Sequence, residues 1–260
     1  MPRKRTVRRR RRRGGLGRLL RPLSVVLAAV AVVAALTLFF KVDKIEVLGN
    51  SRYQESEIAA ASGVLRGDNL VLLDKYAISQ RLCKELPYIT EVRVNRKFPD
   101  TLLVEVTETK AVASIQGAGG YWLINSGGES GGKLLEMVEA EAAKDYLQLI
   151  GLEAVEPAIG KRLELTEGSP VSRERLAALL GAVEDREMFA RADNLDFTGP
   201  EELILNYDGR FRVEIFYDAD FDFKLHCLLE VVARLEPNER GTIRMTLQDD
   251  NKAHFIPSAG

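Results

Sequence analysis

The sequence is poor in the residues from which metal sites and nucleophilic centres are built. Its 260 residues include two cysteines, two histidines and one tryptophan. Two cysteines, Cys83 and Cys227, are too few for a disulfide framework, and each lies in an apolar helical pattern, so we expect two buried free thiols. Side chains of neighbours on a helix point about 100° apart, so His226 and Cys227 are poorly placed to share one metal ion. We predict no metal site, no cofactor and no small-molecule substrate.

Acidic residues are absent from the first 21 positions, which hold 11 of the 37 lysines and arginines. The remainder has 26 basic and 38 acidic residues, a formal charge of −12, although the whole chain carries −1. Tail and body are therefore interpreted separately.

Charged residues are also absent from Leu23 to Phe40, LSVVLAAVAVVAALTLFF. Eighteen residues rising about 1.5 Å each span roughly 27 Å, close to the thickness of a bilayer's hydrocarbon core. Positive charge beside a span marks its cytoplasmic side, which predicts a single-pass protein whose N-terminus is cytoplasmic and whose body is exported. The arginines of this topology signal are Arg8, Arg9, Arg10, Arg11, Arg12, Arg13, Arg18 and Arg21.

Two alternatives exist for this N-terminal region. A cleaved signal peptide would have a shorter apolar core followed by small residues, whereas this segment ends in Leu38-Phe39-Phe40-Lys41. The arginine run could neutralise phosphates of a nucleic acid. Beside an apolar span, orientation and contact with anionic lipid explain the arginines more simply, and no nucleic-acid partner is predicted. An exported location would permit a disulfide between Cys83 and Cys227.

The residues after the span predict the order strand, helix, helix, strand, strand. Lys44 to Val47 alternates polar and apolar before the break at Gly49-Asn50. Helices are expected at about 55–62, ending at Gly63, and at about 75–86, ending at Pro87. Alternating residues then predict two strands, at 92–95 and 102–107, joined by a turn at 97–100.

The second half predicts a mainly antiparallel sheet with helices. Tyr121 to Asn125 is rich in strand formers and precedes a glycine cluster, which indicates a hairpin. Ser169-Pro170 is expected to open a helix, and a second helix is expected from Asp220 to Leu235. Asp208-Gly209 predicts a hairpin between two alternating segments. Strands are expected at 241–247 and, as a short extension, at 253–256.

Two patterns imitate ligand sites without completing them. Gly127 to Lys133 has the glycine and lysine spacing of a phosphate-binding loop, but Leu134 stands where a serine or threonine must hold magnesium. Asp218, Asp220 and Asp222 alternate as in a calcium loop, but Phe223 and Leu229 occupy the positions that require glycine and glutamate. We interpret the first as a hairpin loop and the second as favourable charge at a helix N-terminus.

The order of elements beside an apolar span resembles the POTRA domain of the bacterial cell-division proteins FtsQ and DivIB. Four segments agree with that family in order and spacing: Val47-Leu48-Gly49-Asn50, Leu86-Pro87-Tyr88-Ile89, Arg96 to Leu102, and Glu108 to Ala113. The resemblance implies an α+β fold, with a transmembrane helix, a β-α-α-β-β POTRA domain and a mixed "β domain". The expected bounds are a tail at 1–22, the span at 23–40, the POTRA domain at 41–110, the β domain at 111–257 and a tail at 258–260.

The resemblance also implies a function in the cell-division machinery (divisome) at the septum. In this family a C-terminal sheet edge receives FtsB or DivIC, which associates with FtsL, and the same partners are implied here. Carried over by position, the partner-binding residues would be Ile243, Met245, Leu247 and Phe255. Arg244 replaces an acid that is frequent in the family, and Leu247 stands where an aromatic residue is usual. An alternative is that these apolar side chains pack inward, as alternate residues of a strand do.

No set of catalytic residues emerges from the sequence, so a non-enzymatic scaffold is the main hypothesis. The alternatives are a membrane-anchored peptidoglycan-modifying enzyme and a translocation accessory that uses its POTRA domain as a cradle. Turnover of peptidoglycan by the exported part would favour the first alternative. A secretion defect on depletion would favour the second.

Overall fold

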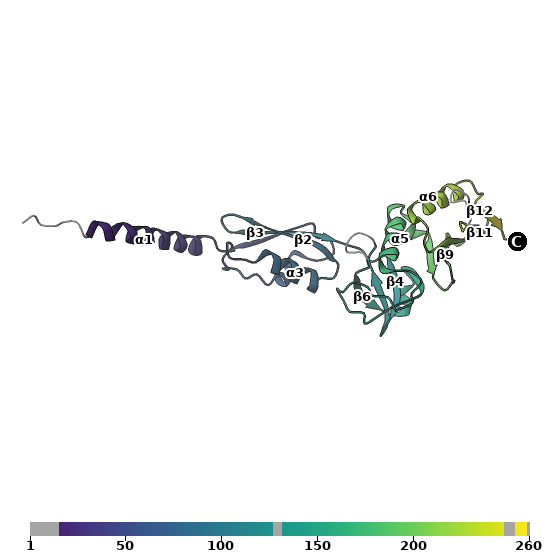
Figure 1. The fold of residues 1–260 in the computed structure, drawn as a ribbon, viewed down its shortest axis with the longest axis horizontal. Helices are drawn as coiled ribbons and strands as arrows, with labels where there is room; N and C mark the ends of the chain where they lie inside the picture. Colours follow the sequence, from purple (N-terminus) through teal and green to yellow (C-terminus); the bar gives the residue numbers. More distant parts are fainter. Residues whose placement is uncertain (1–15, 127–131, 247–252, 259–260) are drawn as a thin grey trace, which may run out of the picture.

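The computed structural model describes residues 16–126, 132–246 and 253–258, and for 16–21 and 35–38 it describes the backbone alone. The molecule is elongated, with helix α1 (Leu16–Phe39) at one end, a small sheet in the middle and a large sheet at the other end (Figure 1). The predictions for Arg8 to Arg13, for Leu247 and for Gly127 to Gly131 lie outside the described residues. Among the described residues, no helix combines the length and the apolar character needed to cross a membrane.

The middle of the molecule is a three-stranded sheet with two helices, in the predicted order strand, helix, helix, strand, strand. Of the described strands, those of this sheet lie in the order β1-β3-β2, with β1 parallel and β2 antiparallel to β3. Its elements are β1 (Lys44–Leu48), α2 (Glu55–Ser62), α3 (Lys75–Glu85), β2 (Ile89–Lys97) and β3 (Thr101–Glu108).

Local sequence fixes the ends of both helices. Glu57 accepts a hydrogen bond from the Gln54 N–H at the start of α2, which ends at Gly63 with φ of 67°. The Asp74 carboxylate caps α3 by accepting from the N–H groups of Tyr76 and Ala77. Apolar side chains of the helices then pack on the sheet and form the first core, which includes Ile58, Ile78, Leu82, Leu102 and Val104.

The far half of the molecule is built on a mixed sheet. The described strands of this sheet number nine and lie in the order β12-β11-β10-β9-β8-β7-β4-β5-β6, with five antiparallel and three parallel pairings. Its strands are β4 (Ala113–Gly117), β5 (Gly120–Ile124), β6 (Leu134–Val138), β7 (Leu147–Ala154), β8 (Ala192–Asp196), β9 (Glu202–Tyr207), β10 (Phe211–Phe216), β11 (Gly241–Arg244) and β12 (His254–Pro257). The prediction of a mainly antiparallel mixed sheet is thus confirmed, although β4, β7 and β8 were not foreseen.

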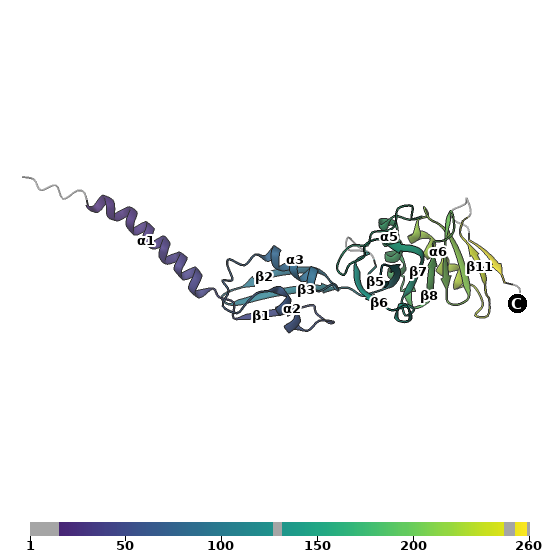
Figure 2. The same ribbon diagram turned by 90° about the horizontal axis from the view of Figure 1, so that it is seen from below.

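Helices α5 (Arg173–Asp185) and α6 (Phe221–Val232) share a second core with this sheet (Figure 2). The turn α4 (Ala140–Ala143) and the 3-10 turn η1 (Met188–Ala190) complete the described helices. The predicted start of α5 at Ser169-Pro170 is wrong, because Ser172 caps the helix by accepting from the Arg175 N–H at 3.3 Å. Asp220 caps α6 in the same way, as its carboxylate accepts from the Phe223 N–H.

Polar side chains and two backbone carbonyls join the two sheets at a junction. Its side chains are those of Arg52, Tyr88, Lys133 and Glu136, and its carbonyls are those of Cys83 and Ile89. The buried Lys133 ammonium donates to the carbonyls of Cys83 and Ile89, at 3.1 and 2.8 Å. The Tyr88 hydroxyl donates to Glu136, and the Arg52 guanidinium lies 3.7 Å from the centre of the Tyr88 ring. Burial lowers the pKa of Lys133, while burial and the bond to Glu136 raise the pKa of Tyr88.

The two cysteines belong to different cores. Cys83 packs against the first core and Cys227 against the second, and they are not joined by a disulfide. Both thiols are half-buried, so the expectation of free thiols is confirmed and that of full burial is wrong.

Candidate protein-interaction edge

The last strand of the large sheet is β12, and this corrects the prediction that residues 241–247 lie at the edge. β11 is covered on one side by β10, to which it runs parallel, and on the other by β12, which pairs antiparallel with it. Ile243 therefore lies in register between Val213 and Phe255 rather than on an outer strand. Among the described strands, β12 has a neighbour on one side alone.

Hydrogen bonds around β11 show which backbone groups of β12 point outward. The Gly241 N–H donates to the Arg210 carbonyl just before β10 at 3.1 Å, and the Met245 N–H, just after β11, donates to the Glu214 carbonyl at 2.9 Å. The backbone groups of odd-numbered residues of β11 therefore face β10. The Ser258 N–H donates to the Arg240 carbonyl at 2.9 Å, so even-numbered residues pair across β11 and β12. The intervening residues of β12, Phe255 and Pro257, direct their backbone groups away from the sheet. Phe255 offers a donor and an acceptor there, and Pro257 offers an acceptor alone.

The side chains of β12 divide between the two faces of the sheet. Phe255 is half-buried on the core face, where its ring meets that of Phe211 edge-on at 6.2 Å. Gly241 makes room for it, because a Cβ on Gly241 would lie 2.9 Å from the Phe255 ring and 2.2 Å from the Ile256 carbonyl oxygen. Ile256 points to the other face and is exposed.

A polar row crosses that outer face and ends at β12. The register places Asn194, Asn206, Arg212, Thr242 and Ile256 side by side on five successive strands. The Asn206 amide donates to the Asn194 side-chain oxygen at 2.7 Å. Because these side chains lie opposite the core face, they form a surface that continues from the sheet to its edge.

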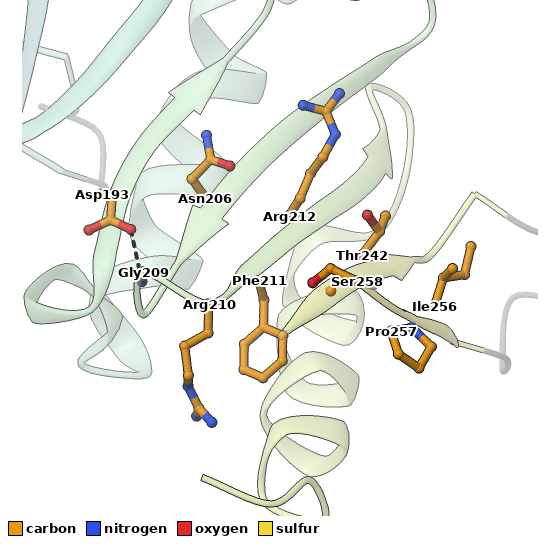
Figure 3. Close-up of a pocket in the computed structure, with 11 residues that line it drawn as sticks. Asp193, Asn206, Gly209, Arg210, Phe211, Arg212, Thr242, Ile256, Pro257 and Ser258 are labelled. Atoms are coloured by element: carbon orange, nitrogen blue, oxygen red, sulfur yellow. Dashed lines mark hydrogen bonds between the residues drawn. The ribbon is translucent and has the colours of Figure 1, made fainter. Parts of the chain in front are cut away.

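An open pocket of about 470 Å³ lies beside this edge (Figure 3). Its wall includes Asn206, Arg212 and Thr242 from the polar row and Ile256, Pro257 and Ser258 from the end of the chain. At the other end, the Gly209 N–H donates to the Asp193 carboxylate at 3.1 Å. The pocket offers donors, acceptors and apolar surface together, which suits a peptide side chain.

Ion pairs hold the strands around the pocket. Asp208 accepts from both Arg191 and Arg210, and these bonds, chiefly that from Arg191, lower its pKa to about 2 against a partial opposing effect of burial. Arg210 also donates to the carbonyls of Glu236 and Pro237, in the loop that leads to β11. The Asp208-Gly209 turn, with φ of 62° and 59°, therefore fixes the approach to the edge as well as the hairpin.

Arg244 has a partner within the sheet. Its Nε donates to the buried carboxylate of Glu214 on β10 at 2.8 Å, and this bond raises the pKa of Arg244. A basic residue at this position of β11 is therefore explained by an acid on the neighbouring strand.

The structure separates the four residues predicted to bind a partner. Ile243 and Met245 are buried in the second core, as the inward-packing alternative described, so their side chains support the edge from inside. Phe255 is half-buried on β12, and Leu247 lies outside the described residues. Arg18 and Arg21 lie in α1, whose side chains are not described there. The sequence reasoning missed Ile256, Thr242 and Arg212, although their alternation with Phe255, Ile243 and Val213 was a usable signal.

The residues of the imitated ligand sites have structural partners. Lys133 bridges the two sheets, Asp220 caps α6, and Asp222 pairs with Arg186 at 2.8 Å. Within residues 16–126, 132–246 and 253–258, no three histidine, cysteine, aspartate or glutamate side chains form a group able to hold a metal ion.

Comparison with known proteins assigns the middle domain. Residues 40–109 match the family described as "POTRA domain, FtsQ-type". The chain is 36% identical over 105 residues to the "Cell division protein FtsQ" of Corynebacterium glutamicum, covering 40% of this chain and 47% of that protein. It is 29% identical over 222 residues to the protein of that name from Syntrophotalea carbinolica, covering 81% of this chain and 73% of that one. It is also 33% identical over 128 residues to the protein of that name from Novosphingobium aromaticivorans, covering 48% of this chain and 36% of that one.

The fold and these matches define a POTRA-bearing protein with a mixed second sheet. The match covers about half the length of the Corynebacterium relative and most of the Syntrophotalea relative. The chain therefore contains a POTRA domain of the FtsQ type and is similar over most of its length to a cell division protein FtsQ, in agreement with the resemblance seen in its sequence. Each of these relatives is named a cell division protein.

Proposed function

We propose that the chain is a non-enzymatic scaffold of the divisome, anchored at the septum by Leu23 to Phe40 and docking other division proteins outside the membrane. The partners would be FtsB or DivIC together with FtsL, as the resemblance implies. The bounds expected for the domains fit the two separate cores, and the uncharged run from Leu23 to Phe40 supports the anchor. Alkaline extraction of membranes tests the anchor, since a chain inserted in the bilayer stays with the membrane fraction.

The observation that carries the docking proposal is the outer side of β12. An extended partner segment would pair with the backbone of Phe255 and accept from its N–H, while the adjacent pocket would receive a partner side chain. Pro257 lacks an N–H, so the added strand would find a donor at Phe255 but none two residues further on. Ile243 and Met245 would contribute by holding β12 in place.

Two substitutions at one position test this edge in the full chain. Phe255→Ala and Phe255→Pro both remove the ring, but the proline also removes the outward N–H and leaves the ladder to β11 intact. Losing one hydrogen bond should weaken binding of the FtsB or DivIC partner about tenfold beyond the alanine variant. Equal affinities of the two variants, measured by co-purification and calorimetry in detergent, would rule out strand addition at Phe255.

Localisation tests the cellular part of the proposal independently. A fluorescent fusion of the full chain should form a band at midcell. A uniform membrane signal in dividing cells would contradict the septal role even if the chain is anchored.

A further inference from the structure

The end of the POTRA domain nearest α1 is fixed to the residues that follow this helix. The Leu70 N–H donates to the Phe40 carbonyl, and the Gly67 N–H to the Val42 carbonyl, both at 2.8 Å. In return the Val42 N–H donates to the Asp68 carbonyl at 2.8 Å. The loop at 64–73 is therefore held against the chain one to three residues beyond the end of α1.

The turn between β2 and β3 meets the same residues. The Asp43 N–H donates to the Asp100 carbonyl at 2.8 Å, and the Phe98 ring lies edge-on to that of Phe40 at 5.0 Å. The loop at 64–73 and the turn at 98–100 thus form one surface around the end of α1, here called the proximal end (Figure 1).

The proximal end exposes large apolar side chains. Leu65 is 70% exposed, Leu72 75% and Phe98 57%, and Phe39 at the end of α1 is 76% exposed. Single exposed leucines are ordinary on a protein surface, but these residues all belong to the end of the apolar helix or to the loop and turn held against the residues that follow it. The grouping is therefore informative, whereas Leu48, 54% exposed at the other end of β1, is a single exposed residue.

The acids of the proximal end are occupied by protein partners. Asp43 pairs with Arg66, and Asp68 accepts from the Leu65 N–H at 2.8 Å. Asp74 caps α3, and Asp100 accepts from the Thr101 hydroxyl at 2.9 Å. These carboxylates therefore need not be transferred unpaired toward a lipid surface, where an uncompensated charge would oppose apolar contact.

From these observations we propose that the proximal end rests in the headgroup region of the bilayer that α1 enters, with Leu65 and Leu72 in contact with lipid. The inference rests on the proposed membrane anchor and adds to it a second point of contact. Apolar side chains at a bilayer surface bind in proportion to the apolar area they bury. Because the loop is hydrogen-bonded to Phe40 and Val42, it follows α1 to the membrane without a flexible linker. This contact would set the orientation of the domain and direct β12, which lies at the end of the molecule opposite α1 (Figure 1), away from the membrane.

Depth-dependent quenching tests the seating in the full chain. Cys83 and Cys227 are replaced by alanine, and single cysteines are introduced as Leu65→Cys, Leu72→Cys or Leu48→Cys for attachment of a polarity-sensitive fluorophore. The chain is reconstituted in phosphatidylcholine vesicles that contain a nitroxide-labelled lipid. Leu48 is the matched control, because it is an exposed leucine of the same domain at its other end.

We expect labels at positions 65 and 72 to shift to shorter wavelength and to be quenched by the labelled lipid, and the label at 48 to do neither. If the vesicles retain the chain after an alkaline wash and all three labels behave alike, the anchor stands and the seating is overturned. If the chain is released by the wash, the anchor and the seating both fail. Quenching that requires anionic lipid would overturn the apolar contact argued for Leu65 and Leu72.

Discussion

The junction between the two sheets and the outer side of β12 differ in how their polar groups are paired. At the junction, the Lys133 ammonium is buried and donates to two carbonyls of the other domain, and the Tyr88 hydroxyl donates to Glu136. At β12 the backbone of Phe255 points away from the sheet. At the junction the polar groups are thus hydrogen-bonded within the chain, whereas the outer side of β12 presents backbone groups to which a strand of another chain can bind.

The largest effect should come from the core beneath the open edge. Ile243→Ala removes fully buried apolar atoms and should lower the free energy of unfolding by about 2–5 kcal/mol. The matched Ile256→Ala change, on the exposed face of the neighbouring strand β12, should alter it by no more than about 0.5 kcal/mol. Urea unfolding of the full chain in detergent measures both losses, and equal losses would contradict the burial of Ile243 and the exposure of Ile256.

Disrupting the junction between the two domains should lower the free energy of unfolding by less than Ile243→Ala does. Lys133→Met leaves the Cys83 and Ile89 carbonyls without their ammonium donor and should destabilise the chain by about 1–3 kcal/mol. Limited proteolysis between the domains should become faster as well. Lys144→Met is the control, since Lys144 forms an exposed ion pair with Glu141. Unchanged proteolysis would mean that Lys133 does not hold the domains together.

At the turn before β10, Asp208→Asn should lower stability by about 1 kcal/mol near neutral pH, after allowance for solvent screening of this partly exposed carboxylate. The pKa of Asp208 falls from 3.8 to about 2 on folding, so its stabilisation is complete above pH 3.8 and is lost as the pH falls through 2. Asparagine tolerates the positive φ at this position. The difference between variant and parent should therefore shrink from pH 5 to pH 2, and a constant difference would contradict the ion-pair explanation.

The smallest effect is expected from Arg244→Ala, because its guanidinium is largely solvated although it pairs with Glu214. Its loss should cost less stability than Asp208→Asn, and added salt should reduce the difference further. Partner binding should respond more weakly to it than to Phe255→Pro. A stability loss as large as that of Ile243→Ala would place Arg244 in the core of the edge rather than on its surface.

Local patterns predicted the elements whose signals are carried by a few neighbouring residues. The helix at 55–62 ends at Gly63 as predicted, and the Asp208-Gly209 hairpin joins β9 and β10. The start of α5 was misplaced because Ser169 and Ser172 are both plausible caps, and the choice depends on the burial of Val171 in the second core. β7 was missed because it lies between two parallel neighbours, β4 and β8, that are distant in sequence.

The sequence predicted that the candidate edge lies near the C-terminal strands, but it assigned the outer position to residues 241–247 rather than to β12. Alternation placed Ile243 and Met245 on one face of a strand but left open whether that face was inside or outside. Pairing with β12 moved the edge to Phe255, and packing of the face that carries Ile243 in the second core buried that side chain.

By itself the sequence determined the end of α2 at Gly63 and the start of α6 at Asp220, the turns, the order of the first five elements after the span and the uncharged run beside the arginines, because each depends on side chains close together along the chain. Tertiary structure alone decided that Lys133 bridges two domains, that Arg244 meets Glu214, and that β12 rather than β11 is the outermost described strand. These outcomes depend on which distant segments pack together, and the free energy of that choice is shared among many residues of both cores.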